Sequence, residues 1–231
     1  MFGDTDFLKA IRLQSPEVIP TTVGLLPAFW IRRGAEAQEL VARFPQFFPE
    51  GYSVDWSDPS TIAHGTYKAG EHIDEWGCVW SNVNEGMEAI VTGHPVKSEE
   101  DVFSLQLPQN RDGRLPHGFM YLRLLDLCGF DNAMYMFGDE DEAIEVLVDK
   151  VLQYNIYQVE ALIDKFDGLA VFGDDLGTQH GLAIGVDRWR KYLKPCYKKL
   201  YGMIKERHPD TLVYMHTDGC IHQIMGEIGR A

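Results

Sequence analysis

The hydrophobic pattern alternates between short apolar runs and longer stretches with helical spacing. Apolar runs typical of strands lie at residues 18–26, 118–125, 169–172 and 211–215, and residues 72–82 have the pattern of a turn that leads into a strand. Apolar residues at helical spacing are found at residues 7–12, 35–44, 95–105, 139–165 and 187–207. Strands that alternate with helices are typical of an α/β fold with a parallel sheet and right-handed crossovers.

Local signals refine two of these helices. Ser98 followed by Asp101 predicts a capping box, in which each residue binds the backbone of the other at a helix start. Pro195 lies inside the stretch at 187–207, and because proline lacks an N–H it must kink that helix or split it in two.

The number of repeats indicates how much of a barrel the chain contains. About five β/α units can be counted in the 231 residues, whereas a closed (β/α)8 TIM barrel has eight and usually takes about 250 residues. We therefore predict a single domain over residues 1–231 that is the amino-terminal portion of a TIM barrel and lacks its C-terminal strands. An open barrel exposes strand edges and an apolar interior, so self-association is expected.

Two adjacent carboxylates follow the apolar run at 169–172, where an α/β fold places its active site. Neighbouring residues of an extended segment point to opposite sides, so one carboxylate faces the barrel mouth and the other caps the next helix. We take Asp175 as the inward, catalytic acid or base. Asp174 is kept as a candidate substrate ligand, and Gln179 as a residue that hydrogen-bonds a substrate oxygen.

A second polar pair follows the apolar run at 211–215. His216 and Asp218 are two residues apart, so in an extended segment both side chains point the same way and converge on one site. Imidazole and carboxylate both bind zinc, which makes the pair a candidate for catalysis and for holding a metal. We expect the third ligand beyond residue 231. The alternatives are that Asp218 only orients His216, or that both residues cap the next helix.

Composition excludes several partners. The net charge of −14 argues against a nucleic-acid surface, because phosphate contact needs clustered Lys and Arg. No apolar run approaches the roughly 18 residues of a membrane span. Four widely spaced cysteines and the lack of a signal peptide indicate a reduced, cytoplasmic chain. We therefore expect a small-molecule substrate, with neither nucleic acid nor membrane as a partner.

Tryptophan side chains offer a surface for a flat ligand. Trp30, Trp76 and Trp80 could form an aromatic wall beside a substrate. The alternative is that these large side chains belong to the core, which is the commoner role.

Four motifs occur in an order that resembles a known family. They are Asp-Glu-Trp-Gly at 74–77, His-Pro-Val-Lys-Ser-Glu-Glu-Asp-Val at 94–102, Gly-Asp-Asp-Leu-Gly-Thr-Gln at 173–179 with Trp-Arg-Lys-Tyr-Leu-Lys-Pro at 189–195, and His-Thr-Asp-Gly at 216–219. Together they resemble the uroporphyrinogen decarboxylase superfamily. The resemblance is greatest for the branch of corrinoid-dependent methyltransferases and O-demethylase components. It covers most of residues 70–225 and implies a (β/α)8 barrel.

For that branch, the resemblance implies methyl transfer from a small methylated substrate to a corrinoid (cobalamin) carried on a partner protein. The resemblance to this branch also implies zinc, which the branch typically holds through a His-x-Cys motif and a later cysteine to turn a thiol into a thiolate nucleophile. In this chain the matching segment runs from His216 to Asp218, with aspartate in place of cysteine.

The resemblance also leaves decarboxylation of uroporphyrinogen or a related tetrapyrrole, in porphyrin biosynthesis, as an alternative that needs no cofactor. The family holds substrate carboxylates with two arginines four apart, and Arg32 and Arg33 stand at a similar place with a different spacing. A second alternative is not an enzyme at all: this polypeptide would be a barrel fragment without catalytic activity.

Overall fold

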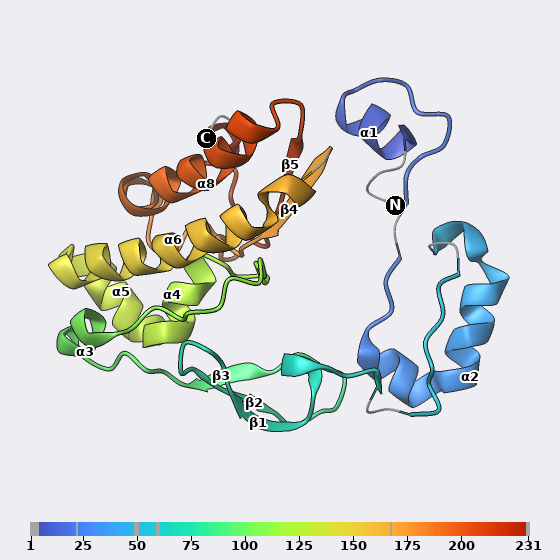
Figure 1. Ribbon diagram of the computed structural model, residues 1–231, viewed down its shortest axis with the longest axis horizontal. Coiled ribbons are helices and arrows are strands. Elements are labelled where there is room, and N and C mark those ends of the chain that lie inside the picture. The colour runs from blue at the N-terminus through green and yellow to red at the C-terminus, as the bar shows by residue number, and fades with distance from the viewer. Residues whose placement is uncertain (1–4, 22, 49–50, 59–60, 167, 230–231) are drawn as a thin grey trace. The chain divides into compact units, whose positions relative to one another are not determined.

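The computed structural model describes residues 5–21, 23–48, 51–58, 61–166 and 168–229. The chain divides into two compact units, whose helices and strands are labelled in Figure 1. Unit 1 comprises Met1–Asp74 and Val79–Gly93, and unit 2 comprises Glu75–Cys78 and His94–Ala231. Two compact units can belong to one domain, so the single domain expected from the sequence stays a prediction.

Unit 1 combines helices with a small antiparallel sheet. Its helical elements are α1 (Thr5–Ile11), α2 (Pro27–Arg43) and the 3-10 turns η1 (Pro45–Phe47) and η3 (Gly65–Tyr67). Its strands are β1 (Gly70–Ile73), β2 (Val79–Asn82) and β3 (Ile90–Gly93), which pair antiparallel in this order. The turn into a strand that the sequence predicts over 72–82 is confirmed, because residues 74–78 connect β1 to β2 there.

The strand predicted over 18–26 is wrong, because none of the described residues in that stretch forms a strand. Val18 and Ile19 are exposed, so this apolar run does not pack on a sheet. Helix α2 begins directly afterwards at Pro27, where proline fits because the first N–H groups of a helix have no intrahelical partner. The helix predicted over 35–44 is the part of α2 that follows a kink at Gly34, whose φ of 41° is not helical.

Unit 2 is built from helices around a two-stranded parallel sheet. In chain order its elements are α3 (Glu99–Ser104), α4 (Tyr121–Cys128), α5 (Phe130–Asp139), α6 (Glu142–Leu162), η4 (Ile163–Lys165), β4 (Leu169–Gly173), α7 (Val186–Arg188), the π-helical turn η5 (Trp189–Leu193), α8 (Lys194–Arg207), β5 (Leu212–His216) and α9 (Met225–Ile228). The chain is therefore a mixed α/β structure with one small antiparallel and one small parallel sheet.

Several sequence predictions for unit 2 are confirmed. The strands expected at 169–172 and 211–215 are β4 and β5, and the long helix expected at 139–165 is α6 with η4. Ser98 and Asp101 form the expected capping box at α3. The stretch at 187–207 is split into α7, η5 and α8, with Pro195 in the first turn of α8.

The strand predicted over 118–125 is wrong, because this stretch leads into helix α4. The buried side chains Tyr121, Leu124 and Leu127 recur every three residues, which places them on one face of a helix. A short apolar run does not distinguish a buried strand from a buried helix, and here packing decides for the helix.

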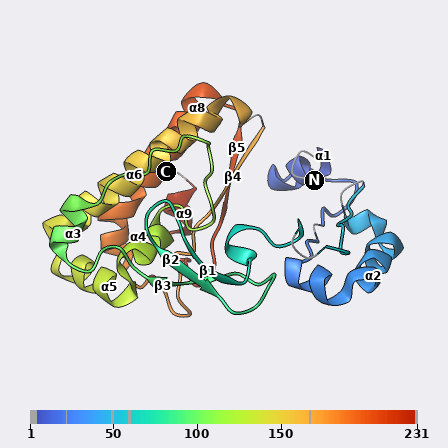
Figure 2. The same cartoon turned by 60° about the horizontal axis from the view of Figure 1, so that its bottom comes forward.

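The parallel sheet has one covered and one open face. β4 and β5 pair in register from Leu169↔Leu212 to Gly173↔His216. Both views show α6 and α8 running along these strands, and Ala170 and Phe172 of β4 are buried (Figures 1 and 2). On the alternate positions, Val171 is 44% exposed and Tyr214 38%. Within the described residues the two strands do not close into a barrel, and no helix there is long and apolar enough to cross a membrane.

An ion-pair cluster fastens α9 to the η5–α8 segment. Glu227 lies 2.6 Å from Arg190 Nη2 and 2.8 Å from Lys194 Nζ. These two cations lower the pKa of the Glu227 carboxyl from 4.5 to about 2. A group with a lowered folded-state pKa stabilises the fold above its ordinary pKa and loses this effect as the pH falls through the folded value.

We therefore expect Glu227→Gln to be less stable than the parent protein at pH 7, with a difference that shrinks between about pH 4.5 and about pH 2. Urea unfolding at a series of pH values measures this difference. Glu206→Gln, an exposed position on α8, is the control and should show no such trend. A Glu227→Gln difference that is constant over this range would contradict the expectation.

Candidate metal centre

The loops that follow β4 and β5 run side by side beyond the sheet. The backbone N–H of Asp174 donates to His216 O (3.0 Å), and that of Gly177 donates to Asp218 O (3.1 Å). The Leu176 N–H donates to the Thr217 hydroxyl oxygen at 3.0 Å. These bonds hold the residues after the two strands in a fixed mutual register at the carboxyl end of the sheet.

Asp174 turns into the core from this edge. Its carboxylate accepts hydrogen bonds from the backbone N–H groups of Tyr121 (2.6 Å) and Leu122 (3.0 Å) and from the Tyr197 hydroxyl (2.7 Å). Burial raises the pKa of Asp174, while the three hydrogen bonds act in the opposite direction. Asp174 was expected to bind substrate and to cap the next helix. It instead caps the first turn of the earlier helix α4, with both oxygens enclosed by protein.

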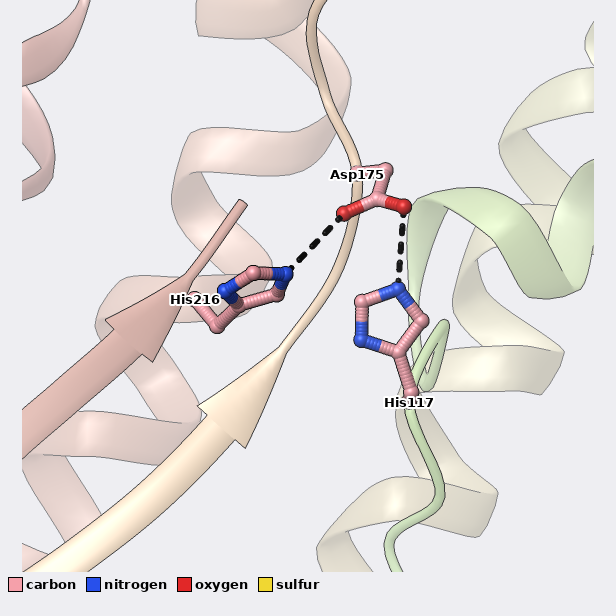
Figure 3. Close-up of side chains that lie close together, drawn as sticks. All are labelled: His117, Asp175 and His216. Atoms are coloured by element: carbon pink, nitrogen blue, oxygen red, sulfur yellow. Dashed lines mark ion pairs between the residues drawn. The ribbon is translucent and has the colours of Figure 1, made fainter. Parts of the chain in front are cut away.

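Asp175 points the opposite way and meets two imidazoles (Figure 3). Its Oδ2 lies 3.0 Å from His117 Nε2, and its Oδ1 lies 4.0 Å from His216 Nε2. The rings of His117 and His216 are 5.5 Å apart between centroids. Each of the three residues offers one ligand atom, and these atoms all lie within 4.8 Å of one another. We call these three residues the His-Asp-His cluster.

His117 reaches the cluster because its segment crosses the end of β4. The backbone N–H of Gly118 donates to Gly173 O at 2.8 Å. Gly173 lies directly beneath the His117 ring, and a Cβ at this position would collide with His117 Nδ1. A side chain at residue 173 would therefore displace the imidazole from its position in the cluster.

Sequence reasoning missed His117. A strand starting at residue 118 would place His117 at the amino end of the sheet, opposite the predicted site, so the wrong prediction for this stretch hid the residue. The third ligand that the sequence places beyond residue 231 stays a prediction, and the described residues bring together three side chains that could hold a metal ion. The only hint of His117 in the sequence is that it directly precedes a glycine, and this pattern is too common to identify a site residue.

Asp218 lies beside the cluster without belonging to it. Its Oδ1 is 3.5 Å from His216 Nε2, but the side chain is 75% exposed. Its backbone N–H donates to Asp175 Oδ1 at 2.9 Å and so helps to orient that carboxylate. The structure thus brings Asp175, rather than Asp218, between the two imidazoles. Gln179 is exposed on the loop after β4.

Two of the three tryptophans predicted to line a substrate site are core residues within their own units, and the third, Trp80 on β2, is half-buried with its ring stacked on that of His72. Trp30 is 1% exposed and packs in unit 1 with Ala37, Val41 and Phe48. Trp76 is buried in unit 2, where its ring meets Tyr154 edge-on at 5.0 Å between centroids. Neither indole face is open to a flat ligand, because protein side chains already cover it.

Arg32 and Arg33 lie on α2 in unit 1, where they line a pocket of about 320 Å³. Its other lining residues are Leu26, Ala28, Phe29 and Met87. Arg33 pairs with Glu36 at 3.3 Å on the exposed side of the helix. The pocket combines apolar walls with positive charge, which suits an anionic group on an apolar body.

The donors of the His-Asp-His cluster fit a divalent metal. Two imidazoles and one carboxylate are a usual set for catalytic zinc, which keeps a further position open. Ligand atoms around tetrahedral zinc lie about 3.3 Å apart, and because the three ligand atoms here lie within 4.8 Å of one another, the side chains would have to move slightly closer around a bound ion. The side chains of His117 and His216 are 40% and 51% exposed, so a ligand can approach from solvent.

Without a metal, the same atoms form a carboxylate held between two imidazoles, which can bind and transfer protons. Comparisons of the chain with protein families, with curated proteins and with solved structures found no match.

Proposed function

We propose that this chain is a metal-dependent enzyme resembling the uroporphyrinogen decarboxylase superfamily, and that it transfers a methyl group from a small methylated substrate to a corrinoid on a partner protein. In this proposal His117, Asp175 and His216 hold zinc. The observation that carries it is the convergence of these three side chains at the carboxyl ends of β4 and β5. Asp175 and His216 belong to the motifs at 173–179 and 216–219, which carry the resemblance to this family.

The donor set favours methyl transfer over decarboxylation. When bound, zinc would supply a Lewis acid that favours ionisation of a coordinated thiol or water. The Asp175 carboxylate lies between both imidazoles and orients them, and the Asp218 N–H restrains that carboxylate in turn. The metal-free decarboxylation of a tetrapyrrole is the second candidate. It is supported by the pocket that Arg32 and Arg33 line, which suits carboxylates.

We extend the proposal to the fold, as the amino-terminal part of a (β/α)8 barrel. The sheet face that carries His216 also carries Val171 and Tyr214, which are exposed. On the other face Ala170 and Phe172 are buried, and the Phe172 ring lies 5.1 Å from that of Tyr201 on α8, between centroids. Apolar side chains on one face and helices on the other are the layout of a barrel wall. Polar groups at the carboxyl ends of the strands are the layout of its active site.

Elemental analysis of the purified protein tests the metal. We expect about one zinc per chain in the parent protein and in His64→Ala, and loss of zinc in His117→Ala and His216→Ala. His64 is an exposed histidine in unit 1 and is the matched control. Zinc retained in both cluster variants would contradict the site.

Activity separates the two candidate reactions. The zinc-loaded protein should methylate cob(I)alamin from a methylated substrate, as followed by the absorbance of methylcobalamin, and His216→Ala should not. Release of CO2 from uroporphyrinogen by a zinc-free protein, with no methyl transfer, would instead support decarboxylation.

A further inference from the structure

The turn after β5 places a thiol against an imidazole. Cys220 Sγ lies 3.1 Å from His222 Nδ1. The cysteine is half-buried and the histidine is exposed, so the pair lies at the surface of unit 2. A nucleophile within hydrogen-bond reach of a base is the arrangement that activates cysteine in catalysis.

Backbone contacts fix both members of this pair. The Cys220 N–H donates to Thr178 O at 2.7 Å, which ties the turn to the loop after β4. Gly219 has a φ of 82° and packs directly on Gly177, so a side chain at residue 219 would be both strained and blocked. On the other side, the Ile224 N–H donates to Ile221 O at 2.9 Å, and the Ile224 side chain is fully buried.

The other three cysteines lie in environments that suppress reaction. Cys78, Cys128 and Cys196 are buried, and each thiol donates to a backbone carbonyl oxygen: of Asp126 at 3.3 Å, of Leu124 at 2.9 Å and of Tyr192 at 3.2 Å respectively. Burial raises the pKa of Cys128 to about 12 and that of Cys196 to about 12. Buried thiols of this kind are inert toward reagents in solution.

We infer that Cys220 and His222 form a nucleophilic pair, and that Cys220 is a site of covalent modification by soft carbon electrophiles. The sulfur attacks the electrophilic carbon and forms a C–S bond, the leaving group departs with its electron pair, and the thiol proton passes to His222 Nδ1. With an α,β-unsaturated carbonyl there is no leaving group, and the adduct carbon takes up that proton. This site does not depend on the metal proposed for the His-Asp-His cluster.

Alkylation with iodoacetamide at pH 7 tests the inference, with the labelled peptides identified by mass spectrometry. In the folded protein we expect Cys220 to be alkylated first, while Cys78, Cys128 and Cys196 react only after unfolding. In His222→Asn and His222→Gln the rate at Cys220 should fall by at least about tenfold. Both amides can hydrogen-bond the thiol, but neither can take its proton.

The matched control is His180→Asn, which removes an exposed imidazole from the neighbouring loop and should leave the rate unchanged. Circular dichroism establishes that each variant is folded. An unchanged rate at Cys220 in both His222 variants would overturn the inference, and so would alkylation of a buried cysteine before Cys220. Zinc content is measured on the same samples, so failure of the proposed metal site is seen separately.

Discussion

Replacing Asp174 by alanine is expected to lower the free energy of unfolding of unit 2 by about 3–5 kcal/mol. The change leaves three donors without an acceptor: the buried Tyr121 N–H and Tyr197 hydroxyl and the half-buried Leu122 N–H. Each buried, unpaired donor costs about 1–3 kcal/mol, because it lost its water on folding and gains nothing in return. The first turn of α4 would lose its only carboxylate cap within the described residues.

Urea unfolding followed by circular dichroism measures this loss. Tyr197→Phe removes one of the three donors together with its bond, and should cost only about 1 kcal/mol. Asp210→Ala, at an exposed turn before β5, is the matched carboxylate control and should stay within about 0.5 kcal/mol of the parent. If Asp174→Ala were as stable as Asp210→Ala, the capping role would be refuted.

The parts of the fold that sequence reasoning predicted have strong local signals. β4 follows an Asp-Gly pair and ends at Gly173, so its apolar run has defined bounds. The apolar stripe on α6 extends over several helical turns, so its spacing identifies a helix without ambiguity. The alternation of an extended chain also placed Asp174 and Asp175 on opposite sides, as the structure has them.

The parts that could not be predicted depend on tertiary contacts. Which helix Asp174 caps is decided by the packing of α4 against the end of β4, not by the residues that follow it. His117 joins the cluster because Gly118 bonds to Gly173, two residues that are far apart in the sequence. Short apolar runs carry too few residues to show a period, so the stretch leading into α4 was assigned to the wrong element.

The cluster predicts a second large effect, on metal affinity. Asp175→Asn should weaken zinc binding by more than about 1,000-fold, because the cluster then loses its only charged ligand. The amide is nearly the same size, and its oxygen can still accept the hydrogen bond from the Asp218 N–H. Loss of affinity would therefore report the missing charge rather than a collapsed loop. Titration with zinc in competition with a chelator gives the two dissociation constants.

Two further variants show whether Asp175 acts as a ligand or only as part of an acidic surface. Asp218→Asn removes a neighbouring charge that is 3.5 Å from His216, and should cost about tenfold, as expected for a residue that only supports a ligand. Gly173→Ala keeps every charge but pushes the His117 ring aside, and should weaken binding far more than Asp218→Asn does. Equal losses in Asp175→Asn and Asp218→Asn would mean that zinc is attracted by general negative charge. A loss in Gly173→Ala, which changes no charge, would show that zinc binding depends on the positions of the side chains around Gly173, as a site that contains His117 requires.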